Sequence, residues 1–419
     1  MTENQRYQQA KAVYAELGVD TDLALQEMQD KKISIHCWQG DDGIGFEVRN
    51  ASVNTGIMAT GNFPGRARNA EELRADMSKA MQLIPGKHKF NLHSIYAETN
   101  GKKVERDELR YEYFENWVAW AKEKGIGLDF NPTIYNHVNM KEGYSFSSPD
   151  ESIRKFWIRH TMACREIAAR IGKELGQKCV NNIWISDGSK DNCVNKAELR
   201  QNLKNSLDEI FKVKYDPLHM VDALEPKLFG IGTESFVVGS LEFYLSYALL
   251  HHKLLCLDMG HYHPTELVSE KISSLLTFMD ELLLHVSRGV RWDSDHVVTY
   301  TEELQNVFNE IQRMQAFPKV NIALDFFDAS IDRVGAWVIG ARNTLKAILV
   351  SFLEPTELLR RVESAGDWVS RLAYLEECKS LPFGVVWDRF CEMNNVPVRE
   401  KWIPEMKEYE ARVLALRQA

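Results

Sequence analysis

Eight short apolar runs, separated by segments long enough for a loop and a helix, constrain the fold of this chain more than any other feature. Each run is rich in apolar or β-branched residues, and most end in polar or turn residues, as buried strands do. The runs cover residues 33–38, 90–95, 126–130, 180–186, 220–225, 254–258, 282–287 and 320–326. Strands that alternate with helices favour parallel pairing, and eight strands close a barrel. The pattern therefore predicts a (β/α)8 TIM barrel, with an open doubly wound sheet as the alternative.

Helical segments fit between and around these runs. The clearest helix is expected over residues 152–175, with Ser148 as its N-cap and Pro149 in its first turn, and a second amphipathic helix over 70–83. The apolar residues of the longer helix follow the spacing of one buried stripe; they are Ile153, Trp157, Cys164, Ile167 and Ile171.

Two segments fall outside the barrel and divide the chain into three parts. Residues 1–30 are expected to form an extra helix, residues 31–345 the catalytic barrel, and residues 346–419 a helical extension interrupted near Pro382 and Pro397. Extensions of this kind cap a barrel or mediate assembly, so the last part is the predicted oligomerisation region.

Composition excludes several classes of protein. A net charge of −9 is evidence against a nucleic-acid binder, which needs a basic surface, and favours a small-molecule partner. Residues 1–8 are polar, without a signal peptide, and no apolar run approaches the ~20 residues of a membrane helix. The seven cysteines contain no C-x-x-C pair, so no disulfide framework or thiolate zinc site is expected. We expect a cytoplasmic protein that binds neither membranes nor nucleic acid.

Potential metal ligands stand at the ends of four consecutive predicted strands. They are Glu225, Asp258, His285 and Asp325. The carboxyl ends of barrel strands are the face where enzymes of this fold build their sites. Three carboxylates converging there without a cation would repel one another and lose solvation. This set of oxygens and one nitrogen therefore predicts a site for Mn2+, Mg2+, Co2+ or Zn2+, although each residue alone is more often a cap, an ion-pair partner or a packed histidine.

A second group of potential ligands follows the same strands. Asp293 and Asp295 stand at alternate positions, so in an extended loop both carboxylates face the same way. With His261 they form a two-carboxylate, one-imidazole set that leaves positions open for water and substrate. His263 is the alternative to His261, and a solvated loop is the alternative for the aspartates. This group predicts a second metal site.

Further side chains are predicted at the barrel mouth. Lys227, two residues after Glu225, is expected to stabilise a developing oxyanion, or else to form a salt bridge. His93 is a further candidate for the catalytic group. Predicted substrate-binding residues are Trp184, Phe130, Phe327 and Asp187, of which Trp184 and Phe327 could equally be structural. Nucleotide-binding glycine motifs and the G-x-S-x-G elbow are absent from the sequence.

Seven sequence blocks resemble the L-rhamnose isomerase family. They are HCWQGDD at 36–42, ATGN at 59–62, LDFNP at 128–132, KLFGIG at 227–232, HVSR at 285–288, RWDSDH at 291–296 and LDFFDAS at 324–330. The blocks are long and unusual, and the likeness runs from about residue 30 into the carboxyl-terminal helices. The first ~30 residues and the tail match less recognisably.

The resemblance implies a (β/α)8 barrel with two adjacent divalent-metal sites, distantly similar to xylose isomerases, which share the Glu-Pro-Lys element. By similarity, the four strand-end residues would bind a structural metal that also holds sugar hydroxyls. His261, Asp293 and Asp295 would bind the catalytic metal, usually manganese. Members of the family interconvert L-rhamnose and L-rhamnulose, the first step of rhamnose catabolism, and are cytoplasmic homotetramers.

The mechanistic hypothesis is a 1,2-hydride shift on the open-chain sugar, assisted by the two cations. Asp295, or a water beside it, would move the O2 proton, and Lys227 would stabilise charge near O1. A cis-enediol proton transfer is the alternative. Three other functions are considered. The acidic composition disfavours a metal phosphodiesterase or nuclease, and the second ligand group disfavours a sugar-binding sensor. The third is an isomerase of another aldose.

Overall fold

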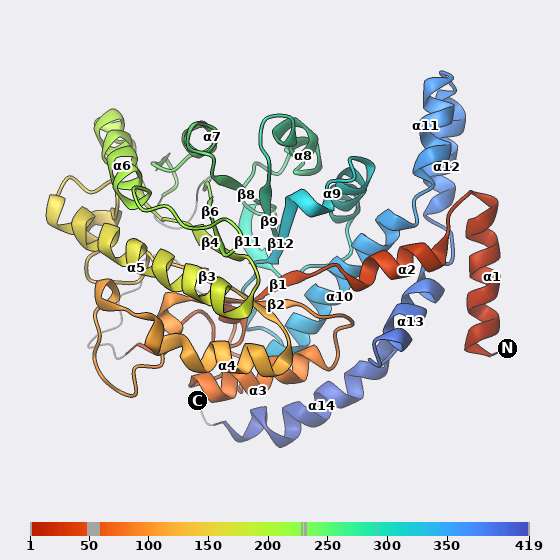
Figure 1. Cartoon of the computed structure of the whole chain (residues 1–419), viewed down its shortest axis with the longest axis horizontal. Helices are drawn as coiled ribbons and strands as arrows, with labels where there is room; N and C mark the ends of the chain where they lie inside the picture. The colour runs from red at the N-terminus through yellow and green to blue at the C-terminus, as the bar shows by residue number, and fades with distance from the viewer. Residues whose placement is uncertain (1, 48–58, 228, 230–232, 291, 418–419) are drawn as a thin grey trace.

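Eight parallel strands form a closed barrel in the computed structural model (Figure 1), with β1 next to β12 and the order β1-β12-β9-β8-β6-β4-β3-β2. The strands are β1 Ile33–His36, β2 Lys89–His93, β3 Gly127–Asn131, β4 Cys179–Ile183, β6 Met220–Leu224, β8 Leu254–Asp258, β9 Leu282–Val286 and β12 Val320–Leu324. Each predicted run overlaps one of them, so the predicted TIM barrel is confirmed. The structure describes the chain apart from residues 1, 48–58, 228, 230–232, 291 and 418–419, and apart from the side chains of 292–294.

Helices cover the outside of the barrel (Figure 1). They are α3 Ala70–Met81, α4 Glu115–Lys124, α5 Glu151–Leu175, α6 Lys196–Ile210, α7 Leu241–His251, α8 Ser269–Leu276, α9 Glu302–Arg313 and α10 Arg333–Phe352. The predicted apolar stripe of α5 is buried. Its N-cap is Asp150, which accepts a hydrogen bond from the Ser152 N–H, and not Ser148 as the sequence predicted.

Two short antiparallel sheets, each of two strands, stand among the loops that follow the barrel strands. One pairs β5 Gly188–Ser189 with β7 Phe236–Val237, and the other pairs β10 Arg288–Val290 with β11 Trp292–His296. The second pair, a hairpin, carries Asp293 and Asp295, for which the sequence predicted an extended loop.

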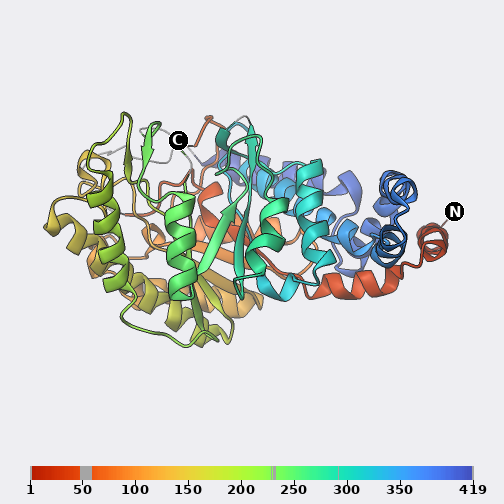
Figure 2. The same ribbon diagram turned by 90° about the horizontal axis from the view of Figure 1, so that it is seen from above.

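The remaining helices form the amino- and carboxyl-terminal extensions. They are α1 Glu3–Glu16, α2 Thr21–Gln29, α11 Thr356–Ser364, α12 Trp368–Cys378, α13 Phe383–Met393 and α14 Trp402–Arg412. Residues 1–30 thus hold two helices instead of one, and the proposed boundary at residue 345 falls inside α10. In Figures 1 and 2, α1, α11 and α12 gather at the end of the molecule farthest from α5 and α6.

The interior of the barrel is packed separately from the layer between strands and helices. Its small apolar cluster comprises Val180, Ala223, Leu254, Cys256, Leu283 and Ala323. Successive side chains of a strand point to opposite faces, so the inward positions of each strand are two residues apart. The residues two positions further along β6, β8, β9 and β12 therefore lie above this cluster, and they are the four predicted metal ligands.

No single helix of the described residues is long and apolar enough to cross a membrane. The bent pair of α10 and α11, which meet at 51°, passes that test by length and composition. Most residues of α10 are buried inside the protein.

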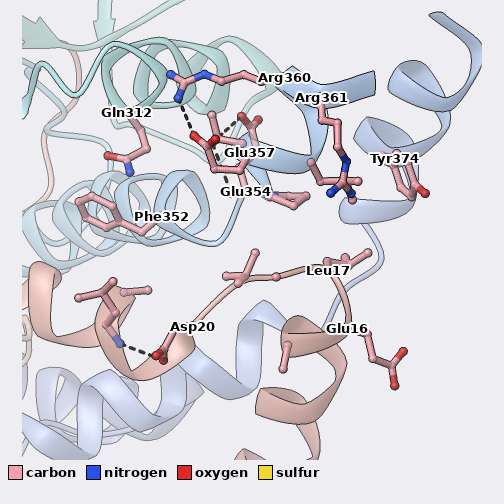
Figure 3. A pocket seen from close by; sticks show the side chains of 18 of the residues that line it. Glu16, Leu17, Asp20, Gln312, Phe352, Glu354, Glu357, Arg360, Arg361 and Tyr374 are labelled. Atoms are coloured by element: carbon pink, nitrogen blue, oxygen red, sulfur yellow. Dashed lines mark hydrogen bonds and ion pairs between the residues drawn. The ribbon is translucent and has the colours of Figure 1, made fainter. Parts of the chain in front are cut away.

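A pocket of about 660 Å3 opens between the α1–α2 turn and the junction of α10 with α11 (Figure 3). Its wall includes Asp20, Phe352, Glu354 and Arg361. None of the predicted site residues lines it, so this pocket is separate from the candidate site.

Candidate metal centre

Four side chains converge at the carboxyl ends of β6, β8, β9 and β12, which are adjacent in the barrel. One ligand atom from each of Glu225, Asp258, His285 and Asp325 lies within 4.8 Å of the others. The first three residues are buried, and Asp325 is partly exposed. The strand register explains the convergence, because Asp258 pairs with His285 across β8 and β9. The structure therefore brings together the four ligands predicted from the sequence.

The imidazole of His285 lies at the centre of the group. Its Nδ1 is 3.5 Å from Glu225 Oε2, 3.5 Å from Asp258 Oδ2 and 3.2 Å from Asp325 Oδ2. Neither ring nitrogen makes a hydrogen bond. Burial lowers the pKa of His285, but the nearby Cys256 and carboxylates raise it to well above its usual value. The group therefore needs a positive charge, from a proton or from a cation.

The donor set matches a divalent cation. Burial raises the pKa of Asp325 to about 6, although His285 acts in the opposite direction. This shift reflects the cost of burying several carboxylates together, which a cation would remove. Carboxylate oxygens with one imidazole nitrogen suit Mn2+, Mg2+ or Co2+ better than a metal that demands thiolates. The residues present thus fit a metal of this class.

Hydrogen-bond donors orient the carboxylates. Asn182 donates a hydrogen bond to Glu225, and Trp38 Nε1 donates one to Asp325 Oδ1 at 2.9 Å. Asp258 Oδ1 accepts two, from the Gly260 N–H at 2.6 Å and from the Ser287 hydroxyl at 2.9 Å. In Asp258 and Asp325 the other oxygen, Oδ2, faces His285. Such donors fix ligand geometry and tune metal affinity. This role of Trp38 and Asn182 was not predicted from the sequence, although both residues stand at or near the inward-facing ends of strands.

The second predicted ligand group is only partly described. His261 Nδ1 lies 3.0 Å from the Pro226 carbonyl oxygen and 3.2 Å from Glu225 Oε1, so His261 borders the first group. His263 is exposed and bonds to Thr265, which favours His261 of the two. The side chain of Asp293 lies outside the described residues. Asp295 has a φ of 43°, and its carbonyl oxygen accepts a hydrogen bond from the Phe327 N–H at 2.9 Å.

A lysine and a tryptophan face each other beside Glu225. The Nζ of Lys227 lies 4.7 Å from the centroid of the Trp184 ring, a cation–π distance. The indole Nε1 of Trp184 is buried and makes no hydrogen bond. Tyr135 packs against the same ring edge-on, with centroids 5.9 Å apart. The arrangement places the lysine charge over the face of the Trp184 indole.

His93 and Phe327 pack around Trp38. The His93 ring packs edge-on to Trp38 at 4.7 Å, and the Phe327 ring is 6.3 Å from it. His93 Nδ1 is 3.0 Å from Thr133 Oγ1. Burial lowers the pKa of His93 to about 3, so the imidazole is neutral near pH 7. These rings form an aromatic wall beside Asp325.

Phe130 and Asp187 lie elsewhere, in contrast to the prediction. Phe130 is fully buried and packs edge-on to Phe114 at 4.9 Å, because its side chain points outward while the next residue of β3 points inward. Asp187 accepts hydrogen bonds from both the N–H and the hydroxyl of Ser145 and of Ser147, so it anchors that loop. Burial raises the pKa of Asp187, although these donors oppose the shift.

Comparison with known proteins gives a consistent family assignment. The model of the L-rhamnose isomerase (RhaA) family matches residues 1–417. The L-rhamnose isomerase of Mannheimia succiniciproducens is 53% identical over 416 residues, covering 99% of both chains. The Escherichia coli enzyme is 51% identical over 413 residues, covering 99% of this chain and 98% of its own. The Rhodopirellula baltica enzyme is 50% identical over 411 residues, covering 98% of this chain and 96% of its own.

Among solved structures, an L-ribulose 3-epimerase is similar with a TM-score of 0.47 and 12% sequence identity, covering 80% of this chain and 97% of the epimerase. The family assignment comes from the sequence matches, which span nearly the whole chain. The chain is thus an enzyme, an isomerase, and belongs to the L-rhamnose isomerase family.

Proposed function

We propose that this chain interconverts L-rhamnose and L-rhamnulose with divalent cations, Mn2+ first among them, in L-rhamnose catabolism. The observation that carries the proposal is the buried set of three carboxylates and one imidazole at the ends of four adjacent strands. The names of the relatives supply the substrate, and the donor set supplies the cofactor class. Zn2+, Co2+ and Mg2+ are the alternative ions for one of the two positions.

Two groups of side chains would hold the cations. Glu225, Asp258, His285 and Asp325 would hold one, and His261, Asp293 and Asp295 the other. When bound, such ions polarise the carbonyl and hydroxyl oxygens of the open-chain sugar and lower the pKa of the C2 hydroxyl. The position of His261 beside Glu225 supports two neighbouring positions that share the barrel mouth.

The proton transfers fall to the polar side chains at the mouth. Asp295 accepts the O2 proton, and Lys227, near Trp184, donates a hydrogen bond to O1, where negative charge develops. His93 is neutral and uses Nδ1 toward Thr133, which leaves Nε2 for a sugar hydroxyl. The left-handed backbone of Asp295 is a conformation that non-glycine residues adopt mainly at constrained sites.

The hydrogen on C2 then moves to C1 with its electron pair, and the O2 proton is transferred so that O1 becomes a hydroxyl. This 1,2-shift predicts that deuterium at C2 of L-rhamnose is retained at C1 of L-rhamnulose. A cis-enediol route would release the label to solvent. Mass spectrometry of the product distinguishes the two routes.

The carbon chain and methyl group of the sugar are expected to pack against aromatic side chains. Trp184 and Phe327 were predicted for this role, and Trp38 joins them because it contacts both His93 and Phe327. Phe130 and Asp187 are not included, since their side chains are committed to other contacts.

The carboxyl-terminal extension supports assembly into a homotetramer. No residue of α12 is buried, and its Trp368, Val369 and Leu372 are 56%, 81% and 56% exposed. An apolar patch of this kind suits contact with another copy of the chain. Light scattering should give four times the chain mass, with smaller species for W368E. The seven free cysteines suit a cytoplasmic location.

The direct test is ketose formation from L-rhamnose by chelator-stripped protein, before and after addition of Mn2+. We expect activity only after the addition. Metal binding without turnover of L-rhamnose would contradict the substrate assignment and would direct the search to other aldoses. Sugar binding without turnover of any aldose would favour a sugar sensor.

A further inference from the structure

A second set of donor atoms extends one layer deeper into the barrel. Ligand atoms of Glu225, Cys256 and His285 also lie within 4.8 Å of one another, and all three residues are buried. This set shares two members with the four-residue group and has the Cys256 sulfur in place of the oxygens of Asp258 and Asp325. The barrel thus contains two overlapping sets of cation ligands.

The position of Cys256 follows from strand periodicity. Cys256 lies two residues before Asp258 on β8, so both side chains face the barrel axis. The equivalent residues two positions before the other ligands are Ala223, Leu283 and Ala323, which pack with Cys256 in the interior cluster. Of these four side chains only the cysteine carries a metal-binding atom. The alanines, below Glu225 and Asp325, are small and leave the thiol beside the carboxylate layer.

His285, which the two sets share, gives a further sign of a ligand at this level. His285 is 2% exposed, and neither of its ring nitrogens makes a hydrogen bond. A buried imidazole without hydrogen bonds is rare unless an ion or a water occupies its neighbourhood. One of these nitrogens lies in the same ligand group as the Cys256 sulfur, so the sulfur and the imidazole face a common point.

We propose that the barrel mouth offers two alternative cation positions: a hard one at Glu225, Asp258, His285 and Asp325, and a deeper thiophilic one at Glu225, Cys256 and His285. Oxygen-rich ligand sets hold Mn2+ and Mg2+, whereas sulfur ligands select Cd2+, Zn2+ and Cu+. When a thiophilic ion binds, the S–H bond of Cys256 breaks, a metal–sulfur bond forms, and the proton leaves to solvent. No electron is transferred.

Competition between the two positions follows from their shared ligands. Glu225 and His285 cannot serve both ions fully, so a thiophilic ion in the deeper position displaces the hard ion and releases Asp258 and Asp325. This inference rests on the proposed function, in which the hard ion is the cofactor. It predicts that Cd2+ inhibits by removing Mn2+ from the shared ligands.

The test is a Cd2+ titration of chelator-stripped, full-length protein, followed by the ultraviolet charge-transfer absorption of cadmium–thiolate bonds. We expect a band that corresponds to one bound Cd2+ per chain, its loss in C256S, and its suppression when Mn2+ is present. C179S is the matched control, because Cys179 is an equally buried strand cysteine in the outer core, and it should keep the band. The C256S protein should still take up Mn2+, as measured by electron paramagnetic resonance.

An unchanged band in C256S, or a band that Mn2+ does not suppress, would overturn the proposal. If C256S does not fold, cadmium NMR of the wild-type protein decides, because a sulfur ligand moves the resonance far downfield of an oxygen and nitrogen site. Isomerase activity with Mn2+ is measured separately. A cadmium band without turnover of L-rhamnose would refute the proposed function, whereas turnover with no Cys256-dependent band would refute only the deeper site.

Discussion

The charged side chains of the barrel and those of the carboxyl-terminal helices lie in opposite environments. Glu225 and Asp258 are almost completely buried, and each carboxylate is oriented by a donor from a neighbouring strand or loop. On α11, by contrast, the ion pair of Arg360 with Glu357 is 2.7 Å long between side chains that are 49% and 85% exposed. Water screens the second kind of charge, whereas only a partner or a cation stabilises the first.

This contrast assigns different roles to the two regions. The barrel concentrates charge where it can bind an ion. The extension leaves apolar side chains exposed on α12, and its charges are dispersed over the surface. Substitutions should therefore affect stability and catalysis strongly in the barrel and weakly in the extension, and the following predictions test this difference.

The largest effect is expected at Asp222, on the outer face of β6. Its carboxylate contacts Arg165 Nε at 2.9 Å and Lys253 Nζ at 2.7 Å, and all three side chains are largely buried. Removing the acid in D222A leaves two buried cations, which should cost about 3–5 kcal/mol of unfolding free energy. Chemical denaturation measures the loss. The exposed-pair control E357A should lose about 0–1 kcal/mol, and an equal loss in both variants would contradict the contrast.

A ligand substitution should come next. E225Q keeps the size of the side chain but removes a charge from the metal set, so turnover should fall roughly 10^2- to 10^3-fold and bound Mn2+ should decrease. Initial rates and elemental analysis measure the two quantities. E357Q, the same change on exposed α11, should retain both. Full activity and metal content in E225Q would exclude Glu225 from the site.

Loss of the hydrogen bond that Trp38 donates to Asp325 should have a smaller effect, on metal affinity. W38F removes the Nε1–H that bonds to Asp325 Oδ1, so Mn2+ affinity should weaken by about 10- to 100-fold. W120F is the matched control, because Trp120 Nε1 donates to Ser78 on the outside of the barrel. Equal Mn2+ affinity of W38F and the wild-type protein in a calorimetric titration would remove Trp38 from this role.

The smallest effect should depend on pH. Asp332, the N-cap of α10, is buried, its Oδ2 has no hydrogen bond, and burial raises its pKa to about 6 from the ordinary 3.8. Stability from this group is therefore complete below the unfolded pKa and is lost as the pH rises through about 6.

D332N keeps the acceptor for the Gly335 N–H but carries no charge. Its free energy of unfolding should therefore exceed that of the wild-type protein by on the order of 1–2 kcal/mol at about pH 8. At about pH 4 the two free energies should be similar. The control is D367N, at the N-cap of exposed α12, where hydrogen bonds from Ser370 lower the pKa of the acid more than burial raises it. D367N should not gain stability at high pH. Denaturation at both pH values checks this, and an identical pH dependence in the two variants would contradict it.

The barrel and the first set of candidate ligands could be predicted because both follow from patterns within short segments of the sequence. Strand runs such as 254–258 end in a charged residue after apolar ones, and in a parallel barrel all such ends meet at one face. Periodicity does not say which face the last residue of a run occupies. Phe130 was therefore placed at the mouth, whereas its side chain packs outward on Phe114.

The other differences between prediction and structure concern the N-cap of α5, the number of helices in residues 1–30 and the hydrogen-bond donors. Ser148 and Asp150 are both good N-caps, and only the backbone path selects Asp150. Residues 1–30 were predicted as one helix, but Gly18, with a φ of 80°, ends the first helix and allows α2 to begin at Thr21. Asn182 lies on β4 and Trp38 follows β1, whereas the carboxylates that they orient lie at the ends of other strands, so no spacing in the sequence links them.

The most direct test of the central claim is anomalous diffraction from crystals grown with Mn2+. The account predicts a manganese peak within bonding distance of Glu225, Asp258, His285 and Asp325. A second peak near His261 and Asp295 would extend the account to both proposed positions. Crystals of protein that is active with Mn2+, but with no peak among the four strand-end residues, would contradict it.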